Sequence, residues 1–240
     1  MNKYFIFYIV LFLSFSFSQE EQPYPPLDLI TIPTSGTLPK GTFSLETLLM
    51  NNGGILPKFL LGITDNFTLG MSFGVQKFIG TGDFSKNKNA PEIYLKYRLY
   101  EETETMPAIS IGMDTQGRGQ YIDSKERYEK KALGVYCVLS RNWSMLGNFG
   151  FHIGVNKNVI EKKDQDMNLF FGFDKEINRS FSILAEYNLS RDDDGETNSE
   201  GIFIRDGKGY LNLGIRWSAT ETLLLEVKHP DLFTNIILNQ

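Results

Sequence analysis

A two-residue alternation of apolar and polar side chains, repeated along most of the chain, is the feature that most constrains its fold. The alternation is clearest in residues 91–116, where two runs of about ten residues flank a short polar turn, residues 101–105. Successive side chains of a β-strand point to opposite faces of the sheet, so these runs predict a β-hairpin with one apolar and one polar face. A run of this length allows a tilted strand to cross a bilayer. The apolar members of the two runs are Ile93, Leu95, Tyr97, Leu99, Ile109, Ile111 and Met113.

The same alternation returns on both sides of this hairpin and predicts an all-β chain. The further strands are expected at residues 42–51, 58–63, 67–77, 132–140, 146–156, 167–174, 181–189, 208–217 and 222–228, with a last one at 232–239. Pro57 is expected at the start of the second strand or outside it, because proline has no N–H to donate to a ladder hydrogen bond.

The lengths of the connections carry a second signal. The connections after the second, fourth, sixth, eighth and tenth strands are short, whereas those after the third, fifth, seventh and ninth are longer and polar, at residues 78–90, 117–131, 157–166 and 190–207. Such alternation is typical of transmembrane β-barrels. The sequence therefore predicts an antiparallel transmembrane β-barrel of about 10–12 strands in residues 41–240, with short periplasmic turns and longer external loops.

The first forty residues have a different character. Residues 1–18 read as a secretory signal peptide, with Lys3 ahead of an apolar stretch, residues 4–13, and small residues before Gln19. Residues 19–40 contain five of the nine prolines and are expected to form a stiff periplasmic lead-in, which either lies along the rim or enters the lumen. We expect export to the outer membrane of a Gram-negative-type bacterium, with outer-membrane lipid and the barrel-assembly machinery as partners.

The polar face of the predicted strands carries charged residues among many glycines, which predicts a narrow interior filled by a few large polar side chains. Charges removed from water need partners, so we expect these residues to form a lumen polar network. The predicted members of this network are Glu46, Lys96, Arg98, Asp114, His152, Asp174, Glu186, Arg216 and Glu226. On the apolar face, Phe67, Phe181 and Trp217 stand at short-turn ends, where an aromatic girdle belongs.

Composition excludes several classes of function. The net charge of −5 argues against a nucleic-acid-binding surface, and the mean hydropathy of −0.22 argues against a helical membrane protein. The chain has one cysteine, Cys137, and two histidines, too few for a zinc site of the usual kinds. We therefore expect no metal and no cofactor.

Three segments offer candidate chemistry. His152, with Asp114, Asp174 or Glu186, resembles an acid–base pair, although a hydrogen-bonded lumen residue is the favoured interpretation. Residues 190–200 resemble a calcium loop, but the glutamate expected at the twelfth position is absent, and a solvated acidic loop is favoured. In residues 114–121, Arg118 and Tyr121 are candidate loop contacts for a sugar, and a simple rim turn explains the segment equally well.

Four stretches carry a resemblance to a known family, namely residues 31–46 (TIPTSGTLPKGTFSLE), 91–121 without the turn, 134–143 (GVYCVLSRNW) and 168–187 (NLFFGFDKEINRSFSILAEY). They are similar to the YjbH-related exported outer-membrane β-barrel proteins, a family associated with exopolysaccharide systems. The resemblance covers most of the mature chain. It implies an outer-membrane barrel and supplies no catalytic residues.

The sequence thus favours a non-enzymatic outer-membrane β-barrel with a packed polar lumen, associated with surface polysaccharide export or with envelope structure. The alternatives are an outer-membrane barrel hydrolase acting on lipid or peptide, and a soluble periplasmic β-barrel or sandwich that binds a ligand.

Overall fold

The computed structural model describes residues 26–50, 53–80, 85–86, 90–124, 126–144, 146–161, 166–191, 209–220 and 223–229. Within these residues the named elements are all β-strands, and their pairings are antiparallel, so the predicted fold class is confirmed at this level. The strands are β1 (Phe43–Met50), β2 (Gly54–Thr64), β3 (Phe67–Ser72), β4 (Val75–Gln76), β5 (Ser85–Lys86), β6 (Glu92–Tyr100), β7 (Ala108–Asp114), β8 (Arg118–Ile122), β9 (Arg127–Lys130), β10 (Gly134–Ser144), β11 (Asn148–Lys157), β12 (Met167–Asn178), β13 (Phe181–Asn188), β14 (Tyr210–Ser218) and β15 (Leu224–His229).

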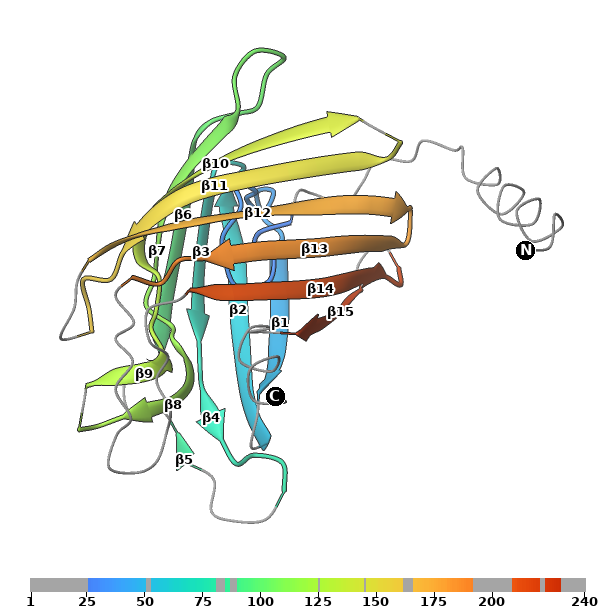
Figure 1. Ribbon diagram of the computed structural model, residues 1–240. Helices are drawn as coiled ribbons and strands as arrows, with labels where there is room; N and C mark the ends of the chain where they lie inside the picture. Colours follow the sequence, from blue (N-terminus) through green and yellow to red (C-terminus); the bar gives the residue numbers. More distant parts are fainter. Residues whose placement is uncertain are drawn as a thin grey trace, which may run out of the picture.

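One large sheet holds all the strands except β8 and β9, and its strands follow one another nearly in chain order (Figure 1). From one edge the order is β15, β14, β13, β12, β11, β10, β7, β6, β3 and β2, with β1 paired to β2 at the other edge and the short β4 and β5 beside it. The strands β1 and β15 are not paired with each other in the described part of the chain, so no closed barrel is seen there. The predicted signal peptide, residues 1–18, and the predicted last strand, residues 232–239, lie outside the described residues.

The predicted hairpin of residues 91–116 is present as β6 and β7, with Leu95 opposite Met113 and Tyr97 opposite Ile111. Two other strands are longer than predicted: β10 continues past residue 140 to Ser144, and β12 continues past residue 174 to Asn178. The polar residues at these ends were predicted as turns, yet main-chain ladder bonds do not require apolar side chains.

The expectation for Pro57 is wrong, because this residue lies inside β2, opposite Thr47 of β1. Its carbonyl accepts a hydrogen bond of 3.0 Å from the N–H of Phe73 on its other side. The return bond from the nitrogen of Pro57 cannot form, since proline has no N–H. The ladder therefore breaks after Ser72 and resumes at Val75, which divides the predicted strand 67–77 into β3 and β4.

A second correction concerns residues 117–131, which were predicted as a long polar loop. They form the hairpin of β8 and β9, with Ile122 and Tyr128 each only 1% exposed. The hydroxyl of Tyr128 donates a hydrogen bond of 2.9 Å to Glu92 of β6, and Gln76 donates one to the carbonyl of Gly119. The hairpin is therefore anchored to the main sheet by side chains.

The large sheet buries its polar face and exposes its apolar face. Phe43 and Leu45 are each 69% exposed and Ile111 is 42% exposed, whereas Lys96 and Ser110 are completely buried. The buried face packs on residues 26–38, which lie inside the curve of the sheet in Figure 1. The predicted assignment of inner and outer faces is therefore correct for these residues. Within the described residues there is no helix long and apolar enough to span a membrane.

Candidate functional site

Residues 26–38, here called the plug, fill the interior of the curved sheet. The sequence left open whether this part of the lead-in follows the rim or enters the interior, and the structure places it inside. Five of its apolar side chains are at most 5% exposed, and they form two clusters with inward-facing residues of the sheet. These five side chains are Leu27, Leu29, Ile30, Ile32 and Leu38. The close fit needs glycine on the wall, since a Cβ at Gly172 would lie 2.6 Å from Leu29 Cδ1.

The plug is a self-contained turn and not a strand of the sheet. The N–H of Leu29 donates to the carbonyl of Ile32 at 2.9 Å, and the N–H of Thr34 donates to that of Leu27 at 3.0 Å. Among the described residues, main-chain hydrogen bonds between this region and the sheet begin only at Gly41, which pairs with Gly62. Side chains of the inner face therefore hold the plug in place.

Glu186 of β13, which is 2% exposed, is the principal acceptor for the plug backbone. Its carboxylate accepts hydrogen bonds from the N–H groups of Ile30 at 2.9 Å, Thr31 at 2.8 Å and Ile32 at 3.2 Å. Asn212 of β14 donates a further bond of 2.7 Å to Oε1. Because three main-chain donors of the plug converge on one side chain, this contact attaches the plug to β13.

A second anchor holds the side chain of Asp28. Lys58 Nζ lies 3.3 Å from Asp28 Oδ2 and 3.4 Å from Asp114 Oδ2, and Lys96 Nζ lies 3.8 Å from Asp28 Oδ1. Lys96 also donates to the carbonyl of Leu27. Burial by itself raises the pKa of Asp28, but the ammonium groups of Lys58 and Lys96 outweigh burial and hold this pKa below its ordinary value.

Three more cations bind carbonyl oxygens of the plug. Arg216 donates to Asp28 O at 3.0 Å, while Arg118 and Lys228 donate to Ile30 O at 3.1 and 3.5 Å. Glu226 pairs with both Arg216 and Lys228, at 2.5 Å each. Arg118 was predicted as a loop contact for a sugar, and the structure instead turns it inward onto the plug.

A third anchor is a chain of hydrogen bonds that ends on β12. The N–H of Ser35 in the plug donates to Ser140 Oγ at 2.8 Å, and Ser140 Oγ lies 2.7 Å from His152 Nδ1. His152 Nε2 lies 2.9 Å from Asp174 Oδ1. Gly150 leaves the room for this last contact, because a Cβ there would collide with the carboxylate of Asp174. Ser140, His152 and Asp174 thus place a hydroxyl, an imidazole and a carboxylate group in one continuous line of contacts.

The other predicted site residues lie away from these anchors. Arg98 sits at the short-turn rim, where it binds Asn66 and forms an ion pair of 3.0 Å with Glu101. Glu46 is half-buried on β1 and interacts electrostatically with Lys58 and with Lys228 of β15. Tyr121 packs edge-on against Tyr128, with ring centroids 5.1 Å apart.

Among the site residues that sequence reasoning missed, Lys58 and Ser140 lie on the wall around the plug. Lys58 follows Pro57 directly, at the expected start of its strand. Ser140 had a usable signal, since the outward positions Leu139 and Cys137 place it on the inner face with His152.

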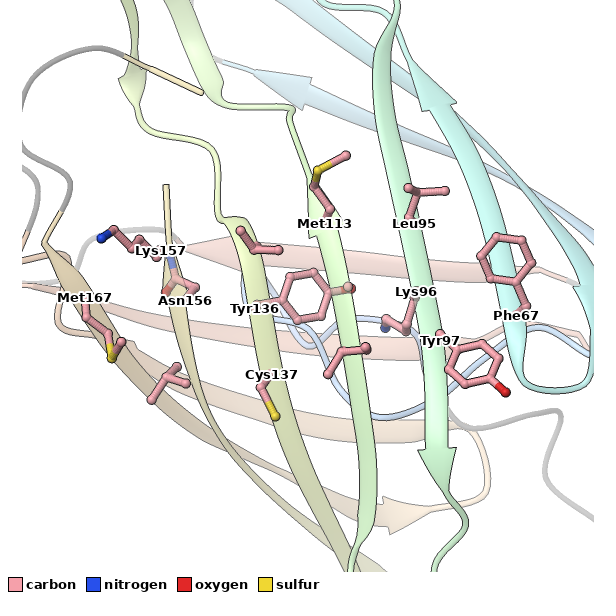
Figure 2. Close-up of a pocket in the computed structure, with 14 residues that line it drawn as sticks. Phe67, Leu95, Lys96, Tyr97, Met113, Tyr136, Cys137, Asn156, Lys157 and Met167 are labelled. Atoms are coloured by element: carbon pink, nitrogen blue, oxygen red, sulfur yellow. The ribbon is translucent and has the colours of Figure 1, made fainter. Parts of the chain in front are cut away.

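On the outer face, a depression of about 490 Å³ crosses β6, β7, β10 and β11. Figure 2 shows Cys137 with the larger side chain of Met167 to one side and that of Tyr97 to the other. Cys137 is half-buried there, on the outer face of β10. The exposed lining is almost wholly apolar, so the depression suits contact with hydrocarbon and presents almost no polar groups to a ligand.

In the part of the chain that the structure describes, no three His, Cys, Asp or Glu side chains are grouped so that they could hold a metal ion. Comparison with known proteins gives no match: no protein-family model, no curated protein and no solved structure is significantly similar to the chain. The geometry of the filled interior is therefore the basis for a functional proposal.

Proposed function

We propose that this chain is a non-enzymatic outer-membrane β-barrel whose lumen is closed by residues 26–38, and that it serves the cell envelope as a plugged barrel. The role in surface polysaccharide export rests on the sequence resemblance to the YjbH-related proteins. Outer-membrane lipid and the barrel-assembly machinery are the partners that such a role requires.

The inverted burial of the two faces is the observation that carries the proposal. Along β1 the apolar residues Phe43, Leu45 and Leu49 are 66–69% exposed, and every other strand of the large sheet with described side chains, except the two-residue β4, also presents exposed apolar residues. Soluble monomers rarely expose a contiguous apolar patch of more than a few hundred Å². A surface that covers most of a sheet needs an apolar solvent, and lipid provides it.

Aromatic side chains on this outer face support the proposal further. Phe67 pairs with Tyr97 at a centroid distance of 6.4 Å, and Phe181 stacks on Trp217 at 6.0 Å. Trp143 lies 6.0 Å from Phe149 in the same way. These pairs stand near the short connections of the sheet, as expected for an aromatic girdle at a membrane interface.

The proposal includes closure of the sheet between its two edges, β1 and β15. Glu46 of β1 is near enough to Lys228 and Glu226 of β15 for electrostatic interaction, which supports approach of the two edges inside the molecule. An open edge exposes unpaired N–H and C=O groups, which hydrocarbon cannot satisfy. A membrane-embedded form of this sheet therefore requires closure.

Fractionation of cells that produce the full chain tests the proposal. We expect the mature protein, beginning at Gln19, in the outer-membrane fraction after extraction with alkaline carbonate, and faster migration in unheated than in heated gel samples. Recovery in the soluble periplasmic fraction, with no effect of heating on mobility, would favour the soluble β-sheet protein instead.

A hydrolase is the second candidate, because Ser140, His152 and Asp174 form a hydrogen-bonded line of the residue types used in acyl transfer. Two observations weigh against it. Ser140 is 4% exposed, and its Oγ already accepts the N–H of Ser35, so a substrate carbonyl has no access while the plug is in place. The line is equally well explained as an anchor for the plug.

The two interpretations of Ser140 differ in what they predict for a nucleophile-directed reagent. We expect a fluorophosphonate probe to leave the wild-type protein and the Ser140→Ala variant equally unlabelled. Labelling of the wild type that is lost in Ser140→Ala and in His152→Ala would establish the hydrolase and overturn the non-enzymatic role.

A further inference from the structure

The plug places one carboxylate, that of Asp28, between two lysines of the inner face. Lys58 Nζ is 3.3 Å and Lys96 Nζ 3.8 Å from its oxygens, and the side chains of Lys58 and Lys96 are 12% and 0% exposed. Buried cations need an anionic partner, and Asp114 forms a second ion pair, of 3.4 Å, with Lys58. This part of the wall is therefore built to receive a carboxylate from whatever occupies the interior.

Two tyrosines beside the lysines are not satisfied by the plug. Tyr94 and Tyr136 are 1% and 4% exposed, and neither hydroxyl makes a hydrogen bond of normal geometry with a described residue, although the two groups lie near each other. The Oδ1 of Asn156, on the strand next to Tyr136, also has no partner among the described residues. Buried polar groups are normally paired, so the wall offers more hydrogen bonds than the plug uses.

The plug covers these tyrosines with apolar side chains. Leu27 belongs to the cluster around Tyr94, and Leu29 to the cluster around Tyr136. Lys58 Nζ stands 3.9 Å from the centroid of the Tyr94 ring, so ring, hydroxyl and ammonium group lie together. The plug thus supplies a carboxylate to the lysines of this wall but no hydrogen-bond partner to the two tyrosine hydroxyl groups.

The way the plug is held makes its exchange feasible. Contacts that involve a side chain attach it to the sheet, and among the described residues the hydrogen bonds between two main-chain groups of the plug stay inside the turn formed by residues 27–34. Displacement of the plug would leave the ladder of the large sheet intact.

We propose that the inner face around Lys58, Lys96, Tyr94 and Tyr136 is a binding site for an acidic saccharide, and that Asp28 of the plug occupies the carboxylate position in its absence. The carboxylate of a uronic-acid unit would bind the two lysines. The C–H face of the sugar ring would pack on the tyrosine rings. Sugar hydroxyls would pair with the tyrosine hydroxyls and with Asn156 Oδ1, which the plug leaves without partners. The proposal rests on the proposed function in one respect, namely that the interior is a lumen that such a polymer reaches.

An acidic peptide is the competing class of ligand, and the unpaired hydroxyls argue against it. A peptide of aspartates would repeat the carboxylate contacts of the plug, and its side chains carry no hydroxyl groups to pair with Tyr94 and Tyr136. A ligand that carries both carboxylate and hydroxyl groups matches the lysines and the tyrosines together.

Calorimetric titration of the full, detergent-refolded chain with tetragalacturonic acid tests the proposal. The plug competes with the saccharide for the site. The apparent affinity of the wild type is therefore the intrinsic affinity multiplied by the fraction of molecules whose site is open. We expect Asp28→Asn to bind at least about tenfold more tightly than the wild type, and Asp28→Glu, the matched control, to resemble the wild type. Neutral maltotetraose should bind neither protein.

Variants in the Asp28→Asn background separate the contributions of charge and hydroxyl group. Lys58→Met should abolish binding, and Tyr94→Phe, which removes one oxygen atom and leaves the ring, should weaken it about fivefold or more, as expected when one buried hydrogen bond is lost. Heat-modifiable gel mobility identifies the variants that have folded. If Lys58→Met does not fold, the affinity of the Tyr94→Phe variant alone tests the site.

Equal affinity of the wild type and Asp28→Asn, or no binding by either, would overturn the proposal. So would a tetra-aspartate peptide that binds Asp28→Asn as tightly as tetragalacturonic acid does. These results are independent of cell fractionation: recovery in the periplasm refutes the membrane location, whereas loss of saccharide binding with correct fractionation refutes the site alone.

Discussion

The N–H of Ile30 donates a hydrogen bond of 2.9 Å to Glu186, a residue 156 positions later in the chain. This contact ties the plug to β13, near one edge of the sheet. The other anchors reach β2, β6 and β10, so the plug connects strands that are distant within the sheet. The plug is thus part of the packed core and a link across the interior.

Replacement of Glu186 by alanine should loosen the plug. Three N–H groups, those of residues 30–32, would lose their acceptor, and each buried unsatisfied donor, as at Ile30 and Ile32, costs about 1–3 kcal/mol. We expect a loss of at least about 2 kcal/mol in the free energy of unfolding, read from the urea midpoint of the heat-modifiable gel band. Glu104→Ala, in the exposed turn between β6 and β7, is the control and should change the midpoint little. Equal midpoints for Glu186→Ala and the wild type would contradict the anchor.

A cation on the outer face should block assembly. Ile111 lies near the middle of the sheet on β7 and is 42% exposed, and an arginine at the bilayer midplane costs about 2–4 kcal/mol. Ile111→Arg should therefore be nearly absent from the outer-membrane fraction, whereas the apolar Ile111→Leu should be present at the wild-type level. Normal membrane levels of Ile111→Arg would show that this face is not in contact with lipid.

The plug should prevent conduction. In planar bilayers we expect little or no steady current from the wild type, because residues 26–38 fill the interior and charges there are paired. A variant that lacks residues 26–38 should conduct, and Glu186→Ala, with the plug loosened, should open intermittently. A steady, porin-like conductance of the wild type would refute the packed interior.

The attachment of the plug should weaken in acid. The pKa of Asp28 is held below its ordinary value of 3.8: burial raises it, and the opposing effect of Lys58, Lys96 and more weakly Lys228 is larger. A carboxyl group with a lowered folded-state pKa stabilises the fold fully above its unfolded pKa, and this contribution is lost as the pH falls through the folded pKa. Glu46 and Asp114 are the other carboxyl groups that face Lys58.

Hydrogen exchange of residues 26–38 at pH 7 and pH 3, corrected for the intrinsic rates, measures this effect. Wild-type protection should be full at pH 7 and decrease at pH values below 3.8. Asp28→Asn should show lower protection at both values and no decrease between them. A decrease of the same size in Asp28→Asn would assign the acid effect to another group.

The division of the chain into two faces was predictable from the sequence, because the period of a strand is two residues and does not depend on distant contacts. The exposed Ile111 and the buried Lys96 follow from that rule alone. The break in pairing between β3 and β4, opposite Pro57, was not predictable. It depends on which neighbouring strand the nitrogen of Pro57 faces and on the register that places Phe73 beside it.

The partners inside the sheet were also beyond the sequence. Lys58 and Asp28 are 30 positions apart, and Glu186 meets the plug across more than 150 positions. Such pairs are set by the path of the plug. Its sequence has no two-residue alternation of apolar and polar side chains, so the sequence does not indicate which strands the plug faces. Arg118 illustrates the point: its place at a strand exit predicted a surface contact, and the plug instead draws it inward.

The tryptophans provide the most direct test of the central idea, that the apolar face lies in lipid. The chain has two tryptophans, Trp143 and Trp217, and both lie on the outer face, 41% and 44% exposed. Refolding the full chain into vesicles whose acyl chains carry bromine allows quenching of their emission only on contact with the hydrocarbon or its boundary. We predict strong quenching relative to vesicles of the same lipid without bromine. Equal emission in the two kinds of vesicle would contradict the membrane-embedded barrel.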